Sequence, residues 1–213
     1  MKTFGSDNYR QLCNELSIED PVFQTILNRH GYPPLWSRKP GFETLIHIIL
    51  EQQVSLASAR AALYKLKEKI RSVTPERMLA LNNDELRACY FSRQKMVYAR
   101  HLSTSVLEGK LVFADLAMLE DEGVRHQLKT IKGIGDWTAD VYLMMALHRC
   151  DRFPVGDIAL VNSVKYELDA QDLGKDDILE LSKKWRPNRT VAAFLFWHAY
   201  IQRKGMVVPY EAF

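Results

Sequence analysis

The stretch that decides the interpretation of this sequence is residues 128–139, LKTIKGIGDWTA. It combines the end of one helix, a tight turn with two glycines and the start of another helix. Gly133 and Gly135 can adopt backbone angles closed to other residues, and they leave the N–H groups of the turn open to a bulky anion. A phosphate would then lie at the positive end of the second helix, beside Lys132. An ordinary turn between two helices is the alternative, and the segment alone leaves both open.

Outside this stretch, apolar residues also recur at helical spacing, and no alternating strand of useful length is present. The sequence therefore predicts an all-α fold of about a dozen short helices. Asp20 and Pro21 mark the first predicted start, and Ser55 is predicted to cap another helix. The predicted helices are 21–31, 41–52, one from 55, 75–81, 83–89, 92–107, 116–130, 136–147, 157–168, 176–185 and 188–204.

The amino-acid composition narrows the class of protein only slightly. The 29 basic and 26 acidic residues leave a charge of +3, which is compatible with phosphate binding but does not demand it. Cys13, Cys89 and Cys150 are too widely spaced for a disulfide framework, a zinc site or an iron–sulfur cluster, so a reduced intracellular protein is expected. Residues 1–10 lack the apolar run of a secretion signal, and the apolar stretch 190–196 is too short for a membrane span, so no membrane association is expected.

Three motifs together resemble the helix-hairpin-helix (HhH-GPD) DNA glycosylase superfamily, and within it the 3-methyladenine DNA glycosylase II (AlkA-like) group. They are ILEQQVS at 49–55, GIGDWTA at 133–139 and DRFPVGD at 151–157. The resemblance runs from about residue 41 to residue 197. Occurring in this order, the trio is far more specific than any one member.

The resemblance implies two all-helical lobes with a DNA-binding cleft between them. We expect residues 1–213 to form a single glycosylase unit. Its central lobe would comprise about 41–147, with the hairpin at 128–139, and its second lobe about 1–40 plus 148–213.

The resemblance also assigns roles to the hairpin. Its contacts with the DNA backbone would come from Lys132, Gly133, Ile134, Gly135 and Thr138. Family hairpins bind a monovalent cation, Na⁺ or K⁺, through main-chain carbonyls, which here would be those of Lys129, Ile131 and Gly133. Such contacts to phosphates position a protein on DNA without reading its sequence.

Asp157 matches the catalytic aspartate of the family. Cleavage of an N-glycosidic bond builds positive charge on the sugar, and a nearby carboxylate stabilises that charge and orients or deprotonates the attacking water. The alternative is that Asp157 is only a helix N-cap, and the two roles can coexist. We interpret the competing carboxylates, Asp140 and Asp151, as structural.

Trp137 indicates which nucleophile is used. At this position the base-removing lyases of the superfamily, such as endonuclease III, carry a lysine that forms a Schiff base with the sugar. Because tryptophan cannot do so, we expect a monofunctional enzyme that uses water and leaves an uncut abasic site. No cofactor is expected to be required, and the cysteine spacing excludes the iron–sulfur cluster of endonuclease III.

Trp137, Trp197 and Tyr142 are predicted to line the base pocket, the two tryptophans because they match pocket positions of the AlkA-like group. Alkylated purines such as 3-methyladenine and 7-methylguanine are cationic, so an indole face attracts them. Core packing is the alternative for the aromatic residues, and Trp36 and His198 are further possible walls.

Residues 52–55, here called the wedge turn, match the segment that fills the gap left by a flipped base. Gln52, Gln53 and Ser55 would contact DNA, with Gln53 at the wedge position. The alternative is a polar turn in which Ser55 caps a helix. Adenine-mismatch glycosylases have their catalytic Glu at the position of Ile48, so Glu51 is not that base.

The chain departs from the family pattern at three positions. Val141 stands where some members have a stacking tyrosine, and Tyr90 replaces an expected glycine. Asp136 places a negative charge beside the proposed phosphate site, where it suits the helix dipole but should repel DNA.

The predicted function is removal of alkylated bases from double-stranded DNA by a monomer, in the nucleoid or cytoplasm of a bacterium or the nucleus of a eukaryote. A non-catalytic helix-hairpin-helix DNA-binding module and a helical interaction protein are the alternatives. The sequence leaves the lesion open among 3-methyladenine, 7-methylguanine, hypoxanthine, 1-methyladenine and 3-methylcytosine.

Overall fold

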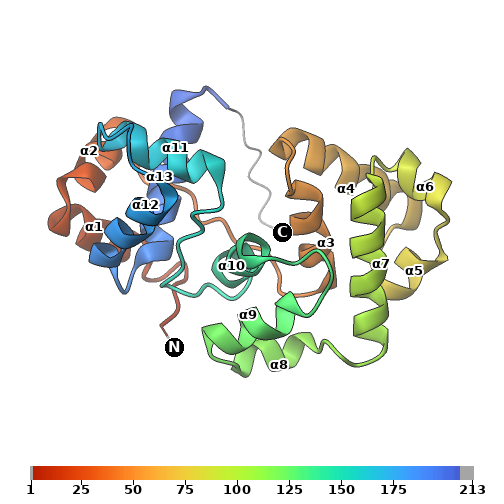
Figure 1. Ribbon diagram of the computed structural model, residues 1–213. Helices are drawn as coiled ribbons and strands as arrows, with labels where there is room; N and C mark the ends of the chain where they lie inside the picture. Colours follow the sequence, from red (N-terminus) through yellow and green to blue (C-terminus); the bar gives the residue numbers. More distant parts are fainter. Residues whose placement is uncertain (1, 207–213) are drawn as a thin grey trace. The chain divides into compact units, whose positions relative to one another are not determined.

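The computed structural model describes residues 2–206 of the 213-residue chain (Figure 1). Within them the secondary structure is helical, with one isolated β-bridge between Thr3 and Arg149, so the all-α prediction is confirmed. None of these helices combines the length and apolarity that crossing a membrane demands. In chain order they are α1 (Tyr9–Glu19), α2 (Pro21–His30), α3 (Phe42–Glu51), α4 (Leu56–Ile70), α5 (Pro75–Ala80), α6 (Asn83–Ala88), α7 (Arg93–Leu107), α8 (Phe113–Met118), α9 (Asp121–Lys129), α10 (Asp136–Met145), α11 (Ile158–Glu167), α12 (Lys175–Leu181), the 3₁₀ helix η1 (Ser182–Trp185) and α13 (Arg189–Arg203).

The chain divides into two compact units. The first contains the described residues of Met1–Ser37 and Leu143–Phe213, and the second is Arg38–Tyr142. Helix α10 therefore begins in the second unit and ends in the first.

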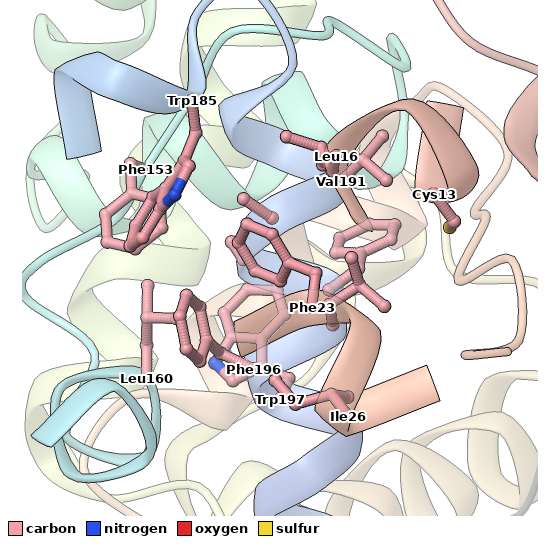
Figure 2. Packing of buried hydrophobic residues seen from close by; sticks show 14 of the residues in the cluster. Cys13, Leu16, Phe23, Ile26, Phe153, Leu160, Trp185, Val191, Phe196 and Trp197 are labelled. Atoms are coloured by element: carbon pink, nitrogen blue, oxygen red, sulfur yellow. The ribbon is translucent and has the colours of Figure 1, made fainter. Parts of the chain in front are cut away.

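Helix α13 is the centre of the first unit. Twelve of its 15 residues are buried, as expected of a helix surrounded by others, and α1, α2 and α11 pack against it. The rings of Phe23, Trp185 and Phe196 meet edge to face or tilted, with centroids 5.2–5.3 Å apart (Figure 2). This aromatic cluster fixes α2, η1 and α13 together, and truncation of one such ring to alanine typically costs about 3–5 kcal/mol.

Helix α3 has the same role in the second unit. Eight of its ten residues are buried, and it packs against α4 and α7, while α5 also packs against α7. Helix α3 is therefore covered on more than one side.

One helix was missed by the sequence analysis, and one predicted helix was wrong. Helix α1 was not predicted, although Tyr9, Leu12, Cys13 and Leu16 are buried at the spacing of one helical face. The single helix predicted over 116–130 is two helices, α8 and α9, because the chain is extended at Leu119 and Glu120 before the acidic first turn of α9.

Candidate active site and nucleic-acid interface

Asp157 lies at the start of α11, in the first unit. Its Oδ1 accepts a hydrogen bond from the N–H of Leu160, at 2.9 Å, which makes Asp157 the N-cap of the helix. The same oxygen accepts a second hydrogen bond from Nε1 of Trp197, at 3.1 Å. The cap that the sequence offered as an alternative is therefore confirmed, and the side chain is only half-buried, so capping leaves it able to take part in chemistry.

The segment before Asp157 is tied to the start of α13. Arg189 makes a bidentate salt bridge with Asp151, at 2.6 and 2.8 Å. The hydroxyl of Thr190 accepts from the N–H of Arg152, at 3.0 Å, and donates to the carbonyl of Arg149, at 2.6 Å. These bonds hold the loop to the start of α13, so Asp157 is presented from a fixed backbone rather than from a free loop.

Trp197 is a core residue as well as a partner of Asp157. Its ring is 9% exposed, stacks on Phe194 with centroids 5.8 Å apart and meets Trp36 nearly at right angles, at 6.4 Å. The sequence prediction treated Trp197 only as a wall of a base pocket or as a core residue. The sequence analysis did not predict its hydrogen bond to Asp157. A buried indole N–H usually has an acceptor, and Asp157 was already a candidate site residue.

The two competing carboxylates are both paired with arginines. Besides the Arg189 pair of Asp151, Asp140 is buried in a salt bridge with Arg125. Ion pairs of this kind hold a carboxylate in place, so these contacts support the structural roles predicted for both residues.

The glycine hairpin lies between α9 and α10, in the second unit. Gly133 has φ +91, and a Cβ at this position would overlap the ring of Tyr98. Only glycine fits there. Gly135, by contrast, has no positive φ, so the expectation that both glycines need special backbone angles was wrong for Gly135. A Cβ added at Gly135 would meet no atom within 4 Å, so this residue faces open space.

Side chains from two other helices hold the hairpin in place. The N–H of Lys132 donates to Nδ1 of His101, at 3.1 Å. The amide Nε2 of Gln52 donates to the carbonyl of Gly133, at 2.8 Å, and to the hydroxyl of Thr138, at 3.0 Å. Sequence reasoning assigned Gln52 to DNA and did not single out Tyr98 or His101, because no local pattern links residues so far apart in the chain.

The other residues predicted to contact DNA differ in exposure. Lys132 and Gly135 are exposed, whereas the side chains of Ile134 and Thr138 are buried, at 5% and 2% exposure. For Ile134 and Thr138, a contact with DNA would therefore have to use the main chain.

Asp136 does not present an isolated negative charge. Its Oδ1 accepts from Nζ of Lys129, at 2.6 Å, and from Arg125, at 2.7 Å. The Lys129 hydrogen bond, together with the charges of both cations, lowers the pKa of Asp136 in spite of some desolvation. The repulsion of DNA that the sequence suggested is thus offset by two neighbouring cations.

Two of the three carbonyls suggested for a monovalent cation each accept one hydrogen bond. The carbonyl of Ile131 accepts from the N–H of Ile134, at 3.0 Å, and that of Gly133 accepts from Gln52. Each carbonyl oxygen has a second lone pair, so these bonds are compatible with an ion ligand at the turn.

The wedge turn is exposed at Gln53 and has an unusual backbone conformation there. Gln53 is exposed with φ +58, an uncommon conformation for a residue other than glycine. Ser55 accepts from the N–H of Ser58, at 3.2 Å, which confirms it as the cap of α4. Glu51 makes a bidentate salt bridge with Arg38. Burial would raise the pKa of Glu51, but Arg38, together with the charges of His47 and Lys95, more than offsets this and lowers it.

The remaining aromatic candidates are unequally exposed. Trp137 is half-buried in the first turn of α10. Tyr142 is fully buried and packs against Phe113, with centroids 6.4 Å apart, and burial raises the pKa of its phenol to about 12. This favours a structural role for Tyr142 over a place in a base pocket.

The departures from the family pattern have structural counterparts. Val141 is buried, at 1% exposure. Tyr90 follows α6 with φ +62, the left-handed conformation in which glycine is preferred after a helix. The expectation of a glycine at this position therefore agrees with the backbone.

The all-helical fold and the two-glycine turn between α9 and α10 define a helix-hairpin-helix protein. The family model of the HhH-GPD superfamily base excision DNA repair protein matches residues 46–187. The chain belongs to this superfamily.

Individual relatives agree with this membership. The chain is 30% identical to the Bacillus subtilis protein YfjP over 187 residues, covering 82% of this chain and 64% of that protein. A solved structure of Schizosaccharomyces pombe 3-methyladenine DNA glycosylase (Mag1) in complex with abasic DNA is 26% identical with a TM-score of 0.81, over 88% of this chain and 95% of the other. A DNA-3-methyladenine glycosidase from Bacillus halodurans is 28% identical with a TM-score of 0.75, over 96% and 95%.

Proposed function

We propose that this protein is a DNA glycosylase that removes alkylated purines from duplex DNA by hydrolysis. The observation that carries the proposal is Asp157, whose carboxylate is fixed at the start of α11 by the N–H groups of Leu160 and Trp197. Membership of a base excision repair superfamily and the likeness to 3-methyladenine DNA glycosylases support it.

Asp157 would stabilise the positive charge that builds on deoxyribose as the base leaves, and would orient the attacking water. With Oδ1 engaged by two N–H groups, the carboxylate would be held in one orientation toward the sugar. Because a cationic alkylated base is already an activated leaving group, one carboxylate suffices.

The hairpin would bind the phosphate backbone. Exposed Lys132, the open face of Gly135 and the positive end of α10 provide the charge and the access for a phosphate. A monovalent cation held by the carbonyls of Lys129, Ile131 and Gly133 would add positive charge beside that phosphate. The partner would be duplex DNA, bound by a monomer.

Aromatic side chains would recognise the extruded base. Trp137, half-buried at the start of α10, would offer an indole face to a cationic purine. Trp197, in addition to any contact with the base, would act through Asp157. The wedge turn, with exposed Gln53 at its tip, would fill the gap left in the base stack.

The decisive experiment compares base release and duplex binding in Asp157→Asn. Asparagine keeps the cap of α11 but not the charge, so release of bases from methylated duplex DNA should fall by about 100-fold or more while binding persists. Asp20→Asn is the matched control, because Asp20 caps α2 and also accepts an indole N–H, from Trp185. Retention of most activity by Asp157→Asn would overturn the assignment, and binding without release by the unmodified protein would indicate a non-catalytic module.

A further inference from the structure

One exposed side chain outside the hairpin, His101 of α7, lies directly against the turn. Tyr98 and His101 are three residues apart, so they project from the same face of α7. The ring of Tyr98 lies against Gly133, and Nδ1 of His101 accepts from the N–H of Lys132, at 3.1 Å. This face of α7 therefore contacts two consecutive residues of the turn.

The bond to Lys132 determines where the imidazole proton of His101 lies. A backbone N–H can only donate, so Nδ1 is the acceptor and carries no proton. The ring is therefore neutral, with its proton on Nε2. Because the Nδ1 edge of the ring faces the turn and the side chain is exposed, Nε2–H is a donor on the other edge of the ring, at the surface beside the hairpin.

A phosphate at this turn needs more donors than the main chain has free. The N–H of Lys132 donates to His101, and the N–H of Ile134 donates to the carbonyl of Ile131, at 3.0 Å. Two N–H groups of the hairpin are thus already engaged within the protein. The exposed side chains of Lys132 and His101 can supply a positive charge and a directed N–H in addition to the remaining main-chain donors.

We propose that His101 binds the phosphate backbone of duplex DNA through Nε2–H, while its Nδ1 holds the turn. One neutral imidazole thus stabilises the hairpin and extends the DNA-binding surface onto α7. The inference rests on the proposed function, because the ligand is the duplex that the hairpin binds. A phosphate contact of this kind adds affinity for DNA of any sequence.

Two amide substitutions separate holding the turn from binding a phosphate, because each reproduces one nitrogen of the ring. In His101→Asn the amide oxygen can replace Nδ1 as acceptor for Lys132, but no donor reaches the position of Nε2. In His101→Gln the longer side chain brings an amide N–H to the position of Nε2. Affinity for a duplex with a tetrahydrofuran abasic site should fall about tenfold in His101→Asn and clearly less in His101→Gln. The opposite order, or equal affinities of the two variants, would overturn the proposal.

The salt dependence of binding distinguishes a neutral donor from a charged imidazolium. The slope of log affinity against log salt concentration reflects the number of cationic groups on phosphates. His101→Asn should lower the affinity without changing this slope, whereas Lys132→Met, which removes an exposed cation, should reduce the slope by about 1. A slope reduced by about 1 in His101→Asn would mean that an imidazolium binds the phosphate, and would overturn the proposal.

His126→Asn is the matched control, because His126 is also an exposed histidine of the second unit, in the last turn of α9. It should leave both the affinity and the slope unchanged. Thermal unfolding checks that all variants are folded, and base release by the unmodified protein is measured in parallel. Normal binding and release by the unmodified protein, with the wrong order of the His101 variants, would reject this inference alone. Absence of duplex binding by the unmodified protein would reject the proposed function as well.

Discussion

Two aspartates of the first unit each combine a helix cap with a hydrogen bond from an indole N–H, although Asp20 uses separate oxygens for the two bonds and is also paired with Lys184. Asp20 caps α2 and accepts from Nε1 of Trp185, at 2.9 Å, and Asp157 caps α11 and accepts from Nε1 of Trp197, at 3.1 Å. Hydrogen bonds to a charged group are among the stronger ones in proteins. The Asp20–Trp185 pair, to which no catalytic role is assigned, can therefore be compared with the Asp157–Trp197 pair, to which one is.

Trp197→Phe should slow base release by about 10–100-fold, since a hydrogen bond to a charged group contributes about 1.5–3 kcal/mol. The phenyl ring keeps the packing on Phe194, so the fold should persist. Single-turnover rates and thermal unfolding measure the two effects. Trp185→Phe is the control: it should lose about as much stability as Trp197→Phe but keep the normal rate of base release. If both variants lose the same rate, the effect of Trp197 is due to stability alone.

Tyr90→Gly should stabilise the second unit by about 0.5–1 kcal/mol. The residue has φ +62, which costs a residue with a side chain about 1–2 kcal/mol, and its side chain is 62% exposed, so little packing is lost. Urea denaturation measures the change. The stability of Tyr90→Asn should lie between those of the unmodified protein and Tyr90→Gly, because asparagine tolerates this conformation better than tyrosine. Lower stability of Tyr90→Gly than of the unmodified protein would contradict the explanation.

At the scale of elements, the hairpin is a turn fixed by its neighbours. The Tyr98 ring occupies the space beside Gly133, and His101 and Gln52 bind the main chain of the turn from α7 and from the end of α3. The turn therefore presents its outer surface in one conformation, which is the requirement for binding a phosphate without a large entropic cost.

Gly133→Ala and Gly135→Ala should separate the two functions of the hairpin. At Gly133 an added methyl meets Tyr98 and φ is +91, so stability should fall by about 1–3 kcal/mol and duplex binding should weaken with it. At Gly135 the added methyl meets no atom within 4 Å, so stability should be unchanged while duplex affinity falls. Thermal unfolding and binding isotherms check both, and normal binding by Gly135→Ala would place the phosphate elsewhere.

At the scale of the whole molecule, the absence of a lysine at position 137 predicts the type of reaction. With Trp137 unable to form a Schiff base, borohydride should trap no covalent adduct between protein and damaged DNA, and the strand should remain uncut after base release. Denaturing electrophoresis detects both products. Endonuclease III, run in parallel, must give an adduct, and an adduct with this protein would show that another amine attacks the sugar.

The sequence alone predicted most of the helices, because apolar residues at a period of 3.6 and side-chain caps are local signals. The caps at Asp20, Ser55 and Asp157 lie where the pattern placed them. Local signals also singled out the hairpin, whereas the glycine expected at Tyr90 came from the family resemblance. Local signals were weaker for α1, which has no side-chain cap bond at Asn8.

Only the tertiary structure decided which side chains support the candidate site. Trp197 reaches Asp157 across 40 residues, His101 reaches Lys132 across 31, and Gln52 reaches Gly133 across 81. Such pairs form because helices distant in sequence pack together, and the periodicity of one helix does not specify which residue of another it will meet.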